Sequence, residues 1–101
     1  MPSRAASPTR VAIEVTVPGL LAEFTDGRRH FPLEAGTLAE ALKCLLEQHP
    51  LLRPHLYDET GRLRKHVLIF YNEDNLATIS DRNIPLRPGD QLQVLQAVSG
   101  G

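Results

Sequence analysis

The sequence predicts an α+β fold, with a mixed sheet of four to five strands and one main helix. Three observations support it. In residues 11–17, β-branched side chains alternate with other side chains, which is typical of a strand. In residues 37–49, leucines recur at the spacing of a helix. Further apolar runs follow at 66–72 and after Asp90. Strands before a single helix and more strands after it are typical of a sheet covered by a helix on one face.

The first half of the sheet is predicted before the helix. Val11, Ile13, Val15 and Val17 alternate with smaller or polar residues, which indicates a half-buried strand. Residues 20–24 are apolar but short, so we expect a packed loop there. A turn at Thr25-Asp26-Gly27 then leads into a second strand at about residues 28–33.

The helix is the clearest element. Thr37 and Glu40 have the spacing of a capping box, in which the hydroxyl accepts from the third helical N–H and the carboxylate accepts from the Thr37 amide. Pro50 is expected to end the helix. Its apolar face is predicted to contain Leu38, Leu42, Leu45, Leu46 and His49.

The second half of the sheet is predicted after the helix. We expect an irregular turn at 51–56, an exposed loop at 57–61, a strand at 66–72, a turn at 72–75 and a short strand at 76–79. The strand at 66–72 is apolar on both faces, which suits either a fully covered strand or an apolar face for a partner. In the last strand, Leu92 and Val94 share one face and Leu95 lies on the other.

A first hairpin, a crossing helix and a last strand beside the first strand make the β-grasp arrangement. We therefore expect a β-grasp domain at residues 10–97, a flexible tail at 1–9 and a flexible, reactive tail at 98–101.

Composition excludes several functions. The net charge is about −1, which favours neither nucleic acid nor membrane as a partner. Cys44 is the only cysteine and there is neither a secretory signal nor a long apolar run, so we expect a cytoplasmic protein. The histidines lack metal-ligand spacing and the carboxylates lack acid–base spacing, so we expect no metal site and no autonomous enzyme. Cys44 is interpreted as a buried, unreactive thiol.

The sequence ends in Gly100-Gly101. Glycine is costly to order and adds little packing, so a terminal pair contributes little to a fold. The pair makes sense if the terminal carboxylate is itself the reactive group.

The ending resembles that of the ubiquitin-like sulfur carriers, which include the small molybdopterin synthase subunit and the thiamin sulfur carrier. The resemblance rests on Leu86-Arg87-Pro88-Gly89-Asp90, then Leu92 and Val94, then Ala97-Val98-Ser99-Gly100-Gly101. Residues 66–72 agree with the family's apolar strand ending in Asn, and residues 52–64 resemble the longer branch, which includes sulfur carriers for cysteine biosynthesis. Two departures are Gln96 in place of a proline and a turn at 72–75 that lacks glycine.

The resemblance implies that an E1-like enzyme adenylates the Gly101 carboxylate and that a sulfur donor converts it to a thiocarboxylate. Gly100 serves as a spacer without a Cβ. The chain itself binds no cofactor, because the activating partner supplies the ATP and Mg²⁺ sites. A sulfur-accepting synthase is a further implied partner, and a metallopeptidase that trims a longer C-terminus is another.

Partner binding is predicted on the outer face of the last strand. Leu95 and Ala97 share that face, Leu68 and Phe70 lie on the expected neighbouring strand, and Val98 and Ser99 lead into the tail. The alternative is that these apolar residues pack against the loop at 20–24.

Two other functions use the same sequence features. The alternatives to a sulfur carrier are a ubiquitin-like modifier joined to lysines of other proteins and a non-catalytic β-grasp interaction module with an incidental tail. The sulfur acceptor stays open among cofactor precursors, an activated serine, a tRNA base and a secondary metabolite.

Overall fold

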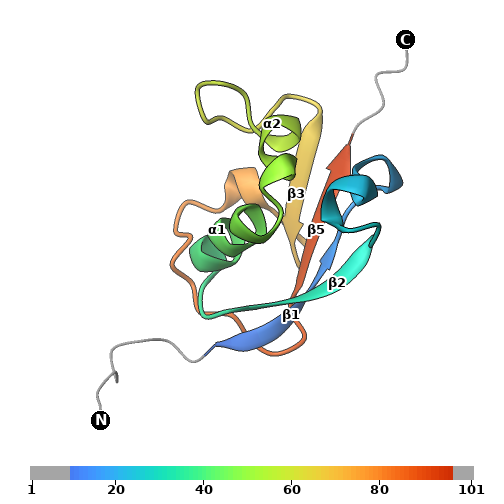
Figure 1. Cartoon of the computed structure of the whole chain (residues 1–101). Helices are drawn as coiled ribbons and strands as arrows, with labels where there is room; N and C mark the ends of the chain where they lie inside the picture. Colours follow the sequence, from blue (N-terminus) through green and yellow to red (C-terminus); the bar gives the residue numbers. More distant parts are fainter. Residues whose placement is uncertain (1–9, 97–101) are drawn as a thin grey trace.

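The computed structural model describes residues 10–96, which form a five-stranded sheet in the order β2-β1-β5-β3-β4. Strand β1 (Val11–Thr16) runs parallel to the last strand, β5 (Gln91–Gln96), and the other neighbours are antiparallel. Figure 1 shows the helices α1 (Leu38–Gln48) and α2 (Arg53–Leu56) on one side of this sheet. The α+β, β-grasp prediction is confirmed. The predicted tails at 1–9 and 98–101, together with Ala97, lie outside the described residues.

The first hairpin differs from the prediction in two places. Strand β2 spans His30–Ala35 rather than 28–33, because the Thr25 hydroxyl donates to the Arg28 carbonyl at 2.6 Å and holds residues 25–28 in a turn. The expected loop at 20–24 is a 3-10 helix, η2 (Gly19–Thr25). Its first turn is closed by the Leu21 N–H, which donates to the Pro18 carbonyl at 2.9 Å.

The main helix, α1 (Leu38–Gln48), begins at the predicted cap, where the Thr37 hydroxyl accepts from the Glu40 N–H at 3.2 Å. The other half of the predicted capping box is wrong. The Glu40 carboxylate accepts from the Gly36 N–H at 2.6 Å instead of the Thr37 amide. Gly36 is buried at the end of β2, and a buried donor requires a partner.

The region after α1 is more helical than predicted. The expected irregular turn contains the 3-10 helix η3 (Pro50–Leu52) and the short helix α2 (Arg53–Leu56). Pro50 and Pro54 each stand in a first helical turn, where a proline leaves no N–H unpaired and its fixed φ suits a helix.

The hairpin after β3 (Val67–Tyr71) also differs. The short strand β4 is Asp74–Asn75, and residues Leu76–Thr78 form the 3-10 helix η4 rather than a strand. The Asn75 side chain caps η4 by accepting from the Ala77 N–H at 2.9 Å. In the turn itself Asn72 has φ 55°, so asparagine occupies the left-handed conformation without a glycine.

The core lies between the sheet and the helices. The inward residues of β1, β3 and β5 pack with the buried face of α1. That face contains Leu38, Ala41, Leu42 and Leu45, whereas Leu46 and His49 are only partly buried. The outward residues of β1, β3 and β5 are exposed or half-buried, so this face of the sheet is open to a partner.

Candidate functional site

Three of the predicted partner-binding residues lie together on the open face of the sheet. Leu68 on β3 is directly opposite Leu95 on β5, and Phe70 is opposite Gln93. Leu68 is 38% exposed and Leu95 is 37% exposed, while their chain neighbours Ile69 and Val94 are buried. We call Leu68, Phe70 and Leu95 the sheet-face patch. Its role in binding stays a prediction, since the structure holds no partner.

The segment at 20–24 does not cover this patch. Leu21 is buried in the core, and the Phe24 ring stacks on His55 with the ring centres 4.2 Å apart. Helix η2 therefore packs against the helical side of the molecule, where it contacts η3. The alternative interpretation of the apolar residues on β3 and β5 is wrong for Leu68 and Leu95.

The reactive end predicted from the sequence continues from β5. Strand pairing persists to Gln96, which lies opposite Val67. Ala97, Val98, Ser99, Gly100 and Gly101 follow and lie outside the described residues, so their roles stay predictions. The described strand fixes the point on the body from which they continue.

The other end of β5 is fixed by the buried carboxylate of Asp90. Tyr71 donates its hydroxyl to Oδ2 at 2.5 Å, and the Arg87 N–H donates to the same oxygen at 2.8 Å. The Asn72 amide donates to Oδ1 at 3.3 Å and accepts from the Gln91 N–H at 2.8 Å. These bonds tie the end of β3 and the turn at 87–90 to the start of β5.

The hydrogen bonds of Asp90 change two pKa values. Burial acts to raise the pKa of Asp90, but the hydrogen bonds donated by Tyr71, Arg87 and Asn72 outweigh burial and lower it below its usual value. Burial, together with the hydrogen bond to Asp90 and the charge of that carboxylate, raises the pKa of Tyr71 to about 12. The carboxylate is therefore ionised and the phenol protonated at neutral pH.

Sequence reasoning missed this network. At the level of the sequence, Asp90 counts only as part of the family's ending and Tyr71 only as part of the apolar strand at 66–72. The available signal was an acidic residue directly before a buried strand, combined with a tyrosine at the end of another strand. A buried carboxylate in such a place requires hydrogen-bond donors.

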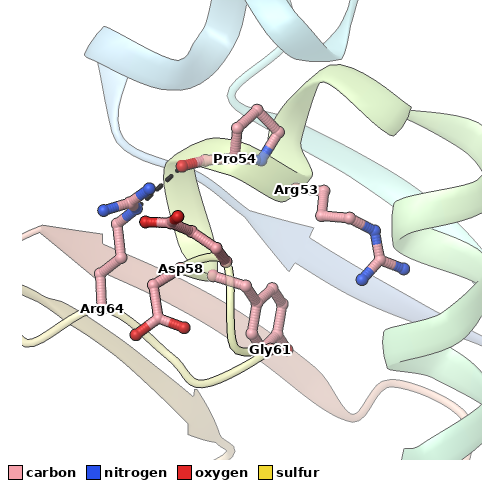
Figure 2. Close-up of a pocket in the computed structure, with 7 residues that line it drawn as sticks. Arg53, Pro54, Asp58, Gly61 and Arg64 are labelled. Atoms are coloured by element: carbon pink, nitrogen blue, oxygen red, sulfur yellow. Dashed lines mark hydrogen bonds between the residues drawn. The ribbon is translucent and has the colours of Figure 1, made fainter.

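A pocket of about 390 Å³ lies at α2 and the loop after it (Figure 2). Figure 2 shows Arg53 and Arg64 at opposite sides of the view, and the Arg64 Nε donates to the Pro54 carbonyl at 2.8 Å. Because Asp58 and Glu59 also line the pocket, it does not concentrate charge of one sign. We assign it no ligand.

Other chemical groups are scattered. Among residues 10–96, no group of three or more His, Cys, Asp or Glu side chains could hold a metal ion. Cys44 is only partly buried and packs against the core, so it is less buried than predicted. Within the same described part of the chain, no helix is long and apolar enough to cross a membrane.

Comparisons with known proteins agree with this geometry. The model of the ThiS family matches residues 15–101. A comparison with curated proteins found no match.

Several solved structures are similar to this chain. SAMP1 of Haloferax volcanii, small archaeal modifier protein 1, has a TM-score of 0.70 and 26% identity, covering 89% of this chain and 99% of that one. A chain of the Amycolatopsis orientalis BexX/CysO complex has a TM-score of 0.72 and 22% identity, covering 88% and 99%. A chain of the complex of subunits 1 and 2 of molybdopterin-converting factor from Helicobacter pylori has a TM-score of 0.57 and 25% identity, covering 90% and 100%.

Leu68 and Ile69 provide a matched test of the two sheet faces. We expect Ile69→Ala to lower the free energy of unfolding by about 2–5 kcal/mol, because it leaves a cavity in the core. Leu68→Ala should cost less than about 1 kcal/mol, the scale of an exposed cross-strand pair. Urea unfolding of both variants measures the difference, and equal losses would contradict the assignment of Leu68 to the open face.

The Asp90 network predicts a pH-dependent effect of Tyr71→Phe. Near pH 7 the variant should lose about 1.5–3 kcal/mol of unfolding free energy, the worth of a hydrogen bond to a charged group. Because folding lowers the pKa of Asp90, its contribution is present above about pH 4 and is lost as pH falls through the folded pKa. Folding raises the pKa of Tyr71 from 10.0 to about 12. The contribution of the Tyr71 phenol to stability is therefore present below pH 10.0 and is lost as pH rises from 10.0 to about 12.

The difference in unfolding free energy between wild type and Tyr71→Phe should therefore become smaller at both acidic and alkaline pH. Urea unfolding at acidic, neutral and alkaline pH measures it. A difference that stays constant across pH would show that the phenol does not interact with the Asp90 carboxylate.

Proposed function

This chain belongs to the ThiS family of ubiquitin-like sulfur carrier proteins, and we propose that the carboxyl group of Gly101 carries the sulfur. The observation that carries the proposal is the extent of the family match, which runs over the β-grasp body and includes Gly100 and Gly101. Members of the family are small carrier proteins. The chain is thus a co-substrate in the proposed reaction, and an E1-like enzyme is the catalyst.

The proposed chemistry begins with the α-carboxylate of Gly101 as the last residue. Its pKa of about 3.5 leaves it ionised at neutral pH, so it needs no base to become a nucleophile. One carboxylate oxygen attacks the α-phosphorus of ATP and pyrophosphate leaves. A donor of sulfide (HS⁻) then forms a C–S bond at the carbonyl of the acyl-adenylate, and the C–O bond to AMP breaks. AMP leaves with that oxygen, so sulfur replaces one oxygen of the carboxylate with no change of oxidation state.

Activation is needed because a carboxylate is a poor electrophile and AMP is a much better leaving group than oxide. In this proposal the partner supplies ATP, Mg²⁺ and the groups that hold the phosphates. Gly100 and Gly101 add no Cβ on either side of the reacting carbon, which suits a narrow channel in that partner. The use of ATP by this reaction is our reason for proposing a cytoplasmic location.

The body of the protein provides the docking surface in this proposal. The sheet-face patch is apolar and partly exposed, and it lies on β5, the strand that leads to the tail, and on its neighbour β3. It is the surface we assign to the E1-like enzyme and to the sulfur-accepting synthase. Two similar chains were solved in complexes, CysO with BexX and one subunit of molybdopterin-converting factor with the other. These complexes support the proposal that this chain acts by binding partner proteins.

The acceptor we favour belongs to cysteine, cofactor or secondary-metabolite biosynthesis, since residues 52–64 resemble the longer carrier branch. If the chain is made with a longer C-terminus, a metallopeptidase would expose Gly101.

Conjugation to proteins is the second candidate function. It is favoured by the similarity to a small archaeal modifier protein at 26% identity. The same acyl-adenylate would then react with a lysine amine, and AMP would leave as an isopeptide bond forms. Isopeptide-linked adducts in a lysate, absent when Gly101 is deleted, would distinguish this function from sulfur transfer.

The thiocarboxylate is tested by intact mass. After incubation with the E1-like enzyme, ATP and a sulfur donor, the wild-type chain should gain the mass difference between sulfur and oxygen. Deleting Gly101 should abolish the gain, and Gly101→Ala should slow it about 10²-fold because the carboxylate is displaced. A variant lacking residues 1–9 is the control and should react like the wild type. No mass gain by the wild type with its activating enzyme would sink the proposal.

The docking role of the sheet-face patch is tested by kinetics. Leu68→Ser combined with Leu95→Ser should raise KM for the carrier in adenylation about tenfold or more, since truncating a hot-spot side chain costs about 2 kcal/mol and about 1.4 kcal/mol is already tenfold in affinity. Gln91→Ser, on the same face of β5, is the matched control and should leave KM unchanged. The role fails if the double variant also keeps the wild-type KM.

A further inference from the structure

The tail continues from one end of the sheet, and the register shows what else lies there. Gln96 is opposite Val67, so the residues just before β3 lie beside the end of β5. Thr16 lies opposite Gln93 on one side and His30 on the other, so the residues just before β2 are at the same end. We call this the exit end. Figure 1 shows β5 between its two neighbours.

Cations flank the exit end on both sides. Arg28 and Arg29 precede β2 and Lys65 precedes β3, where His66 adds an imidazole beside it, and all four side chains are exposed. Within residues 10–96 the ion pair present joins Arg10 to Glu40, so none of these four takes part in one. Glu23 and Asp26 are the carboxylates nearest in the chain to Arg28 and Arg29, so they lie only on the β2 side of the exit end.

The opposite end of the sheet carries mostly carboxylates. Glu34 lies near the end of β2, and Glu73 and Asp74 lie in the turn that follows β3, and all three are exposed. Arg87 and Arg10 are exposed cations at this end, and Arg10 is paired with Glu40. The net charge of about −1 therefore conceals a polarity along the strands, positive where the tail leaves and negative at the far end.

An exposed leucine accompanies the cations. Leu20 is 78% exposed on η2, which follows β1 at the exit end, while the next residue, Leu21, is buried. The Arg29 side chain lies beside Gly19, the neighbour of Leu20. Burying such a leucine on a partner removes apolar surface from water, and the adjacent cations would lie at the rim of that contact.

We propose that the exit end, defined by Leu20, Arg28, Arg29, Lys65 and His66, docks on an acidic protein surface around the channel of the enzyme that receives the tail. This inference rests on the proposed function. Opposite charges accelerate encounter and orient it, so the polarity of the carrier presents the tail first. Burial of Leu20 adds apolar affinity, and salt does not screen an apolar contact. A nucleic acid is a poorer fit, since the far end and the net charge are negative.

The test compares charge reversal at the two ends. One variant combines Arg28→Glu, Arg29→Glu and Lys65→Glu, and the matched control combines Glu34→Lys, Glu73→Lys and Asp74→Lys. A third variant is Leu20→Ser. Adenylation is followed as kcat/KM with the E1-like enzyme at low and high salt, and each variant's unfolding midpoint should stay within about 4 °C of wild type, as expected for exposed sites.

We expect the exit-end reversal to lower kcat/KM at least about tenfold at low salt, with the loss shrinking at high salt because screening removes the attraction. The control should not lower it, and Leu20→Ser should lower it equally at both salt concentrations. If wild type is adenylated and the exit-end reversal reacts equally well, only this inference is overturned. If wild type is not adenylated, the proposed function fails and this inference with it. Tight binding of a short single-stranded RNA, lost in the exit-end reversal, would overturn the assignment to a protein partner.

Discussion

The buried carboxylate of Asp90 is the interaction on which the rest of the structure depends. Its side chain accepts from Tyr71, Asn72 and Arg87, and its own carbonyl accepts from the Glu14 N–H at 2.9 Å. One residue therefore joins β1, β3 and β5 at the point where β5 starts. A slip of one residue would turn Leu92 outward and Leu95 into the core, because side chains alternate between faces. The register set at Asp90 thus decides which side chains form the open face at the tail.

The pKa shifts in the Asp90 network have a structural cause and do not indicate a catalytic site. Perturbed pKa values often mark functional sites. One such pair, Tyr71 and Asp90, lies at the end of β5 opposite the tail, and its oxygens are occupied by hydrogen bonds within the protein. The pair is therefore structural. In the proposed reaction the α-carboxylate is ionised without help, so the body needs no tuned acid or base and only has to dock.

The sequence alone predicted those elements whose signal is local and periodic. The N-terminal cap at Thr37, the alternation in β1 and the opposite faces of Leu92 and Leu95 are of this kind. The short helices η2, η3, α2 and η4 were missed because a proline or asparagine at a turn is equally compatible with one turn of helix. Tertiary contacts made the choice, as when Leu21 is buried in the core. The Asp90 network joins residues about twenty positions apart, and no local pattern reveals such a pairing.

A carrier has to leave the enzyme that loads it before it can reach the one that unloads it. Very tight docking would therefore slow the cycle at dissociation, which is where most affinity differences between related complexes arise. An apolar patch of three side chains on the sheet is small enough for a transient contact. Electrostatic polarity complements such a patch, because it raises the rate of association more than it prolongs the complex. A small apolar patch and a charged end beside one tail thus suit a protein that meets two partners in turn and must be released by the first.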